Sequence, residues 1–201
     1  MKNGIELLDA YNSNSIIRNL FNKEINLMDF PVETAKIPAS FKDYSFIPKE
    51  QLDLIKISKN LEESLKNSRI NDEETSKTIS GICEAIKNAY EHGNLKDNSK
   101  KIYLAKKFSK GKLEFFVGDE GWTINGNLFP YILLFREKNN KESLDEIPDF
   151  YSFCGQNYAP IGHSGVGTKV MNKCFEDIKY FKGEKGLLVY MEKQISRNLK
   201  L

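Results

Sequence analysis

The sequence predicts a protein of the α+β class, and three stretches carry this prediction. Residues 79–94 repeat apolar side chains at the i, i+3, i+4, i+7 spacing of an amphipathic helix. Residues 101–118 hold two runs rich in β-branched and aromatic residues around a short glycine-containing turn, which is typical of an antiparallel hairpin. The glycine-rich residues 162–167 then lead into a second helical pattern, and two short strands follow it.

Length and composition favour an ordinary soluble domain. The chain has 201 residues, 40% of them apolar and 29% charged, which is enough for one domain with a sizeable core or for one domain plus an appendage. The formal charge is +2, and only four of the 30 basic residues are arginines, so we expect no direct nucleic-acid binding. No apolar run approaches the roughly 18 residues of a membrane span. Cys83, Cys154 and Cys174 lack metal-ligand spacing, and we expect a cytoplasmic protein with reduced cysteines and no membrane partner.

The first third of the chain predicts one short helix, one strand and one longer helix. Apolar residues between 16 and 21 indicate an amphipathic helix that covers the domain's own core; the alternative is a dimer or partner-docking helix, so a homodimer stays open. Residues 32–38 can form a short strand, and residues 45–48 a turn. A helix over 51–65 is indicated by apolar residues at helical spacing: Leu52, Ile55, Leu61 and Leu65.

The central helix carries the first pair of chemically useful residues. We expect it to begin at Thr75 or Ser76 and to end at the His-Gly-Asn stop of residues 92–94. Glu84 and Asn88 lie one turn apart, with Glu91, roughly opposite the apolar face. A carboxylate and a carboxamide so spaced can hold a hydrated metal ion and a proton-transfer water, or they can be plain polar surface. The apolar face consists of Ile79, Ile82, Cys83, Ile86 and Tyr90.

A second candidate site follows the hairpin directly. Asp119 stands at the mouth of a buried strand and could accept a hydrogen bond from an amino group such as the exocyclic amine of adenine. Gly121 would let a base come close. The alternative is a turn-forming Asp-x-Gly, which is common.

The third candidate site is the glycine-rich stretch before the last helix. Residues 124–161 form a connection too long for a plain loop, so they suggest a lid or a binding loop, with a helix of its own over 128–136. Glycines at a helix N-terminus let backbone amides approach an anion. The segment fits neither a Rossmann turn nor a P-loop, so it is another kind of phosphate cradle or a loop without a ligand. The helix is marked by Val170, Met171, Cys174, Phe175 and Ile178, and strands are expected over 179–181 and 187–193.

The order of these sites resembles that of the Bergerat-fold ATPases, the superfamily of gyrase, the heat-shock chaperones and sensor histidine kinases. In closer detail the chain resembles the bacterial anti-sigma-factor serine kinases of the switch-protein type. The resemblance covers about residues 33–193 and rests on the stretches EAIKNAYEHGN, VGDEGW, SGVGTKVMNKCFEDI and LLVYMEK. It implies a two-layer sandwich in which a mixed, mostly antiparallel sheet carries helices on one face, with ATP held under a mobile lid.

The resemblance also implies roles for individual residues. Glu84 would be the general base toward an acceptor hydroxyl, and Asn88 would ligate Mg²⁺. Asp119 would bind the adenine amine, and Gly121 would line the base pocket. The phosphate-binding set would contain Gly165, Val166, Gly167 and Thr168, with His163 either donating to the phosphates or lying in solvent.

Two departures from the family pattern stand out. The family usually has a second glycine after Asp-x-Gly, whereas this chain has Trp122 and Thr123. The lid, at residues 125–161, is also long. The predicted organisation is an N-terminal extension over 1–31, an ATPase domain over 32–194 and a tail over 195–201.

The histidine content narrows the expected function. The only two histidines, His92 and His163, lie in the nucleotide motifs, so the phosphoacceptor helix of a sensor kinase is not expected, and the length does not suit the multidomain relatives. The resemblance therefore implies an ATP- and Mg²⁺-dependent serine/threonine kinase. Its partner would be a small anti-anti-sigma-like protein, and it would also sequester a sigma factor. The alternatives are a nucleotide-binding interaction module without catalysis and a degenerate fold that binds no nucleotide.

Overall fold

A computed structural model describes residues 24–29, 32–46, 54–66, 70–109, 111–125 and 166–195. Its strands are β1 (Glu24–Asn26), β2 (Lys42–Phe46), β3 (Ile102–Ser109), β4 (Lys112–Gly118), β5 (Thr123–Asn125), β6 (Asp177–Lys182) and β7 (Leu187–Gln194). Its helices are a 3₁₀ turn (Leu27–Asp29), α3 (Leu54–Lys66), α4 (Asp72–Asn88), a π-helical turn (Ala89–Gly93) and α8 (Val166–Cys174).

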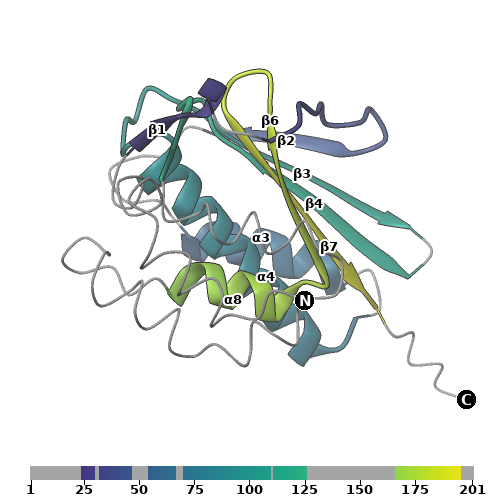
Figure 1. Ribbon diagram of the computed structural model, residues 1–201. Helices are drawn as coiled ribbons and strands as arrows, with labels where there is room; N and C mark the ends of the chain where they lie inside the picture. Colours follow the sequence, from purple (N-terminus) through teal and green to yellow (C-terminus); the bar gives the residue numbers. More distant parts are fainter. Residues whose placement is uncertain are drawn as a thin grey trace, which may run out of the picture.

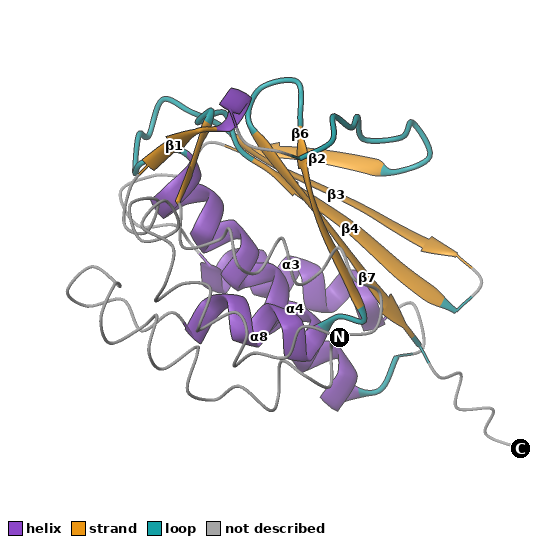
Figure 2. Ribbon diagram, in the orientation of Figure 1, coloured by secondary structure: helices purple, strands orange, loops and turns teal. Residues whose placement is uncertain are grey.

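The described elements form two layers, which confirms the predicted α+β class. Five strands pair in the order β2-β3-β4-β7-β6, all antiparallel, and α3, α4 and α8 lie on one face of this sheet (Figure 1). Figure 2 shows the same separation of helices and strands. Parallel pairing is limited, in the described part of the chain, to one isolated bridge between Thr34 and Lys182, so these strands form an antiparallel sheet rather than a mixed one.

The core lies between the helices and the sheet. Along β4, Leu113, Phe115 and Val117 face the helices and are almost fully buried, as the two-residue period of a strand requires. The intervening Phe116 faces the other way. There it packs in a smaller cluster with Phe41, Ala105 and Leu188. Both faces of the sheet therefore bury apolar side chains. Each fully buried side chain contributes about 1.5–3 kcal/mol to the free energy of unfolding.

Helix α4 begins earlier than the sequence predicts. It starts at Asp72 rather than at Thr75 or Ser76, because the Asn71 side chain accepts a hydrogen bond of 2.8 Å from the Glu74 amide. Three acidic residues, 72–74, then fill the first turn, where the helix dipole favours negative charge. The predicted stop at residues 92–94 is confirmed, since the π-helical turn ends at Gly93.

Helix α3 confirms the helix predicted over 51–65, but one residue of its predicted apolar face is wrong. Leu61 and Leu65 are buried, whereas Ile55 is 71% exposed. Leu54 and Ile57 pack against the core instead. The face therefore runs 54, 57, 61, 65, so the prediction found its last two residues and missed Leu54 and Ile57. Leu52, also predicted on this face, lies outside the described residues.

Strand β2 was not predicted, and it overlaps the turn expected over 45–48. Its backbone pairs with β3 along five residues, from Lys42 opposite Lys106 to Phe46 opposite Ile102. The strand predicted over 32–38 is instead extended chain, bonded to β6 only around residues 33–35. Pairing with β3 determines which segment joins the sheet, and a local sequence pattern carries no information about that pairing.

The described part of the predicted N-terminal extension packs into the domain. Strand β1 pairs antiparallel with β5, and Leu27 is fully buried in the main core. The Leu27 amide donates to the Trp122 carbonyl at 2.9 Å. Residues 24–29 thus support the chain immediately after Asp-x-Gly. The division at residue 31 stays a prediction.

The remaining expectations divide into confirmed elements and elements outside the described residues. The hairpin is confirmed as β3 and β4, and the two final strands as β6 and β7. Helix α8 ends at Cys174, so two residues predicted to mark it lie beyond it: Phe175 follows the helix directly, and Ile178 lies in β6. The helices expected over 16–21 and 128–136 lie outside the described residues.

Candidate functional site

The first half of the site is formed where α4 packs against the start of α8. Gly81, earlier on α4, allows the C-terminal end of α8 to approach, because a Cβ there would lie 2.6 Å from the Phe175 ring and 2.8 Å from the Cys174 Cβ. The absence of a side chain at residue 81 therefore lets the two helices approach closely. The sequence contains this glycine inside an apolar helical pattern, which is a signal for close packing.

Glu84, Asn88 and Gly167 meet at this junction. A Cβ on Gly167 would lie 2.6 Å from Glu84 Oε2 and 3.7 Å from Asn88 Oδ1. Asn88 Nδ2 contacts Met171 Sδ, one turn further along α8, at 3.6 Å. The two polar residues predicted on α4 therefore face the first turn of α8, a place where backbone amides and the helix dipole favour anionic groups.

The other predicted phosphate-binding residues divide between described and undescribed parts of the chain. Val166 is the first residue of α8 and Thr168 the third, half-buried, so both belong to the same helix start as Gly167. His163 and Gly165 lie outside the described residues.

The second half of the site centres on Asp119, at the end of β4. This carboxylate is only 4% exposed. Its Oδ1 accepts hydrogen bonds from the amides of Gly121 (3.0 Å) and Leu187 (3.1 Å). Its own amide donates to the Leu187 carbonyl at 3.1 Å, so the residue is fixed between β4 and β7.

Burial makes the Asp119 carboxyl a weaker acid than an ordinary aspartate. Removal from water raises the pKa of its carboxyl from an ordinary aspartate value to about 7, although the bonds from Gly121 and Leu187 and the charge of Lys100 act in the opposite direction. A buried carboxyl that titrates near neutrality can accept or donate a hydrogen bond there. Such groups are typical of binding and catalytic sites.

Three glycines surround this carboxylate. A Cβ on Gly93 would overlap Asp119 Oδ2, and a Cβ on Gly186 would overlap Asp119 Oδ1. Gly121 was expected to make room for a base, but a Cβ there would overlap the Gly93 carbonyl. The protein's own backbone therefore requires this glycine, whatever the ligand.

Thr123 closes the end of the π-helical turn. Its single hydroxyl hydrogen is shared between the carbonyls of Gly93 (2.9 Å) and His92 (3.2 Å). Trp122 before it has φ of 54°, a left-handed conformation that is rare outside glycine, and its side chain is 37% exposed. Strain of this kind is concentrated at functional sites.

Asn94 is a structural residue of the site that sequence reasoning assigned only to a helix stop. It is fully buried, its Oδ1 accepts the Glu120 amide at 2.9 Å, and its Nδ2 donates to the Lys101 carbonyl at 3.1 Å. The side chain therefore joins the end of α4 to both ends of the hairpin. The signal available in the sequence is an asparagine directly after the glycine stop.

A small cavity connects the two halves of the site. It measures about 30 Å³ and is lined by residues that include Asn88, Gly93, Asp119, Thr123 and Met171. This volume suits about one or two water molecules rather than a nucleobase, since ligand sites usually measure roughly 300–1,000 Å³. Any larger ligand requires the walls to separate.

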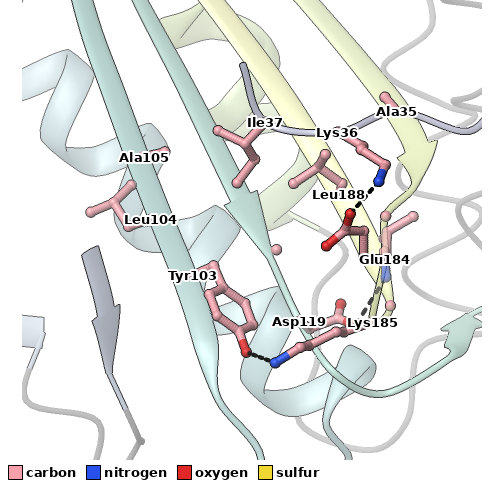
Figure 3. Close-up of a pocket in the computed structure, with 14 residues that line it drawn as sticks. Ala35, Lys36, Ile37, Tyr103, Leu104, Ala105, Asp119, Glu184, Lys185 and Leu188 are labelled. Atoms are coloured by element: carbon pink, nitrogen blue, oxygen red, sulfur yellow. Dashed lines mark hydrogen bonds and ion pairs between the residues drawn. The ribbon is translucent and has the colours of Figure 1, made fainter. Parts of the chain in front are cut away.

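A larger pocket lies on the opposite face of the sheet. It measures about 460 Å³, and Asp119 and Leu187 line it as well as the small cavity (Figure 3). Asp119 therefore stands in the wall between the two spaces.

The described residues contain no group of three or more His, Cys, Asp or Glu side chains that could hold a metal ion by themselves. Asn88 and Glu84 can supply one amide and one carboxylate oxygen. A divalent cation here would need further oxygen ligands from water or from a bound phosphate, which is the usual state of Mg²⁺.

Comparison with known proteins adds no identification: no protein-family model and no curated protein matches this chain. Within the described part of the chain, no helix is long and apolar enough to cross a membrane.

Proposed function

We propose that the protein is a cytoplasmic Bergerat-type ATP-binding kinase that phosphorylates serine or threonine on a small anti-anti-sigma-like partner and sequesters a sigma factor. One observation carries the proposal. A single cavity runs from Asn88 to Asp119, and Glu84 and Asn88 face the N-terminus of α8 at Gly167. Polar groups from three segments distant in sequence thus converge where one end suits a base amine and the other suits phosphate.

The Asp119 end supports adenine recognition. Two backbone amides hold Oδ1, and its second oxygen lies against Gly93, on the side of the small cavity. An ionised carboxylate there would accept a hydrogen bond from an exocyclic amine. Its fixed position between β4 and β7 gives the directional contact that specificity requires.

The Glu84 and Asn88 end supports phosphate transfer. The amides at the first turn of α8 would hold phosphate oxygens, and Asn88 Oδ1 would hold the cation. Bound Mg²⁺ supplies neutralisation of phosphate charge. Glu84 would take the proton from the acceptor hydroxyl, and its closeness to Gly167 Cα keeps the carboxylate beside the phosphate position.

The cavity volume sets a condition on this proposal. A space of about 30 Å³ must widen before a purine enters, so the end of α4 and the Asp119–Ile124 segment must separate on binding. Thr123 and the β1–β5 pairing oppose that movement. Slow, conformationally limited nucleotide association is expected.

The test uses the partner captured by a pull-down with ATP·Mg²⁺ and identified by mass spectrometry. With radiolabelled ATP, the wild-type protein should transfer phosphate to it, and Glu84→Gln should lower the rate by about 10²–10⁴ while ATP still binds. Glu91→Gln, seven residues along the same helical segment, is the matched control and should keep near wild-type transfer. Equal transfer by both variants would disprove the role of Glu84.

The alternative function is a nucleotide-binding interaction module without catalysis. The Thr123 clamp on the π-helical turn favours it, because the family's second glycine is replaced by a residue that restrains this part of the site. Nucleotide-dependent binding of the captured partner, with no phosphate transfer by the wild-type protein, would support the module over the kinase.

A further inference from the structure

Glu120 directly follows Asp119, and its carboxylate accepts hydrogen bonds from three other residues. Oε2 accepts the Lys101 amide at 2.7 Å. Oε1 accepts the Tyr103 hydroxyl and, at 3.2 Å, the Lys185 ammonium. Two of these donors lie at the start of β3, and the third lies in the turn between β6 and β7. The Glu120 side chain therefore ties the chain after Asp119 to two other segments of the sheet.

The backbone of Glu120 closes this network. Its amide donates to Asn94 Oδ1 at 2.9 Å, and Asn94 Nδ2 donates to the Lys101 carbonyl at 3.1 Å. Glu120 and Asn94 thus bind the amide and the carbonyl of the same residue, and Asn94 is fully buried. Because these bonds share their members, a displacement of Glu120 must break several of them together.

The same network reaches Asp119 from the side of β7. Lys185 lies two residues before Leu187, whose amide and carbonyl both bond to Asp119 at 3.1 Å. Lys185 Nζ also donates to Tyr103 Oη at 2.9 Å and lies 5.3 Å from the centre of the Tyr103 ring (Figure 3). Asp119 is therefore held between Glu120 and the 185–187 segment, and Lys185 connects the two.

Glu120 has the charge that this role requires. Its side chain is 20% exposed, and burial acts to raise its pKa. The hydrogen bonds from Tyr103, Lys101 and Lys185 nevertheless hold the pKa below the usual glutamate value. The carboxylate is thus ionised at neutral pH, the form that accepts all three donors in charge-assisted bonds.

A second tyrosine–glutamate–lysine cluster on the same face of the sheet provides a comparison. The hydroxyl hydrogen of Tyr190 is shared between Glu192 (2.7 Å) and Glu114 (3.1 Å). Lys179 Nζ lies 5.7 Å from the centre of the Tyr190 ring. The two clusters have the same kinds of group, but among the described contacts only the first includes the residue next to Asp119. Changes made to the second cluster therefore serve as controls.

We infer that Glu120 is a positioning residue which, held by Tyr103 and Lys185, fixes the Asp119 carboxylate in the orientation that selects adenine over a purine without the exocyclic amine. A hydrogen bond from that amine depends on direction, so a displaced carboxylate loses discrimination between purines before it loses nucleotide binding. The adenine ligand rests on the proposed function, whereas the positioning of Asp119 does not.

The first test needs no nucleotide. In an NMR pH titration of the full chain, the amides of Gly121 and Leu187, which donate to Asp119 Oδ1, should shift together with a midpoint at about pH 7. Tyr103→Phe removes one hydrogen bond to Glu120 without removing a charge, and it should reduce the amplitude of both shifts. Tyr190→Phe removes the corresponding hydroxyl from the second cluster and should leave both shifts unchanged. Unchanged amplitudes in folded Tyr103→Phe, or equal losses in the two variants, would refute the positioning of Asp119.

The second test measures selectivity. Competition binding compares ATP with purine riboside triphosphate, which lacks the exocyclic amine, above the Asp119 pKa of about 7. The wild-type protein should prefer ATP about tenfold or more, the effect of one hydrogen bond to a charged group. Tyr103→Phe and Glu120→Gln should both lower this ratio, and Tyr190→Phe should keep it. Equal weakening of both nucleotides with an unchanged ratio would leave Glu120 a structural role only. Absence of ATP binding by the wild-type protein would contradict the proposed function, and the amide titration would still decide the positioning.

An exposed residue offers a further variant that removes no buried group. Lys185→Ala should lower the ratio in the same direction as Tyr103→Phe and by a smaller factor, because the Lys185 side chain is 57% exposed. Lys179→Ala is the matched control, since Lys179 also pairs with an acid (2.6 Å) and lies over a tyrosine ring, and it should keep the wild-type ratio. Equal effects of the two lysine variants would overturn the inference.

Discussion

The cavities on the two faces of the central sheet differ in volume. Toward the helices, Asp119, three close glycines and the end of α4 leave a mostly apolar cavity of about 30 Å³. On the other face, a pocket of about 460 Å³ has an apolar floor and a charged rim. The sequence motifs point to the small cavity, and no motif points to the large pocket. A sequence motif thus indicates which polar residues come together. The volume of a pocket depends instead on the sizes of side chains on neighbouring strands, which no motif records.

The largest expected difference in stability is between alanine substitutions of two glycines, one on each face of the sheet. Gly121→Ala should cost more than about 3 kcal/mol, because its Cβ would overlap the rigid Gly93 carbonyl. Gly118→Ala should cost less than about 1 kcal/mol, since its Cβ would lie 3.2 Å from the end of the flexible Leu188 side chain. Urea unfolding of both variants measures the difference, and similar costs would contradict the close packing assigned to the helix face.

A smaller effect compares two lysines. Lys193 is nearly buried and pairs with Glu74 at 2.6 Å and with the Cys174 carbonyl at 3.2 Å, which joins β7 to α4 and α8. Lys193→Met should cost about 2 kcal/mol, reduced from a fully buried pair because Glu74 is about one-third exposed. Lys112→Met, which loses a solvent-exposed ion pair with Glu192 at 2.9 Å, should cost much less in urea unfolding.

The Glu74 pair also predicts a pH dependence. The hydrogen bond from Lys193 holds the pKa of Glu74 below its usual value of 4.5. Its stabilisation is therefore present above about pH 4.5 and is lost as the pH falls through the lower folded-state pKa. Lys193→Met should flatten that part of the stability curve, and an unchanged curve would remove the pair from this account.

The contribution of Asp119 to stability should change with pH in the direction opposite to that of Glu74. Its folded-state pKa of about 7 exceeds the unfolded value near 3.8, so the folded protein binds more protons between these values. Its contribution should make stability fall by up to about 1.4 kcal/mol per pH unit from about pH 4 to pH 7 and then level off. Asp119→Asn should remove that slope in urea unfolding across the range. A slope that survives the substitution would assign it to other groups.

The elements defined by local periodicity could be predicted from the sequence. The β3–β4 hairpin, α4 and the final strands follow patterns of apolar residues, and the order of motifs predicted that Glu84, Asn88 and Gly167 belong together. The structure brings these three into contact.

The elements defined by distant partners could not be predicted. Strand β2 exists because β3 pairs with it, and β1 because β5 does. The Asn71 cap depends on a side chain bonding three residues ahead, within a stretch that otherwise contains turn-forming residues. The large pocket is lined by Tyr103, Gly118 and Leu188 from three neighbouring strands, in a register that only the assembled sheet defines.

The central claim is that the Asn88–Asp119 cavity is a nucleotide site, and thermal unfolding with ATP·Mg²⁺ tests it most directly. ATP at about 100 times its dissociation constant should stabilise the wild-type protein by about 2.7 kcal/mol. Asn88→Ala and Asp119→Asn should each lose most of this stabilisation, and Lys179→Ala should keep it. No stabilisation of the wild-type protein at millimolar ATP·Mg²⁺, or equal stabilisation of all the variants, would contradict the claim.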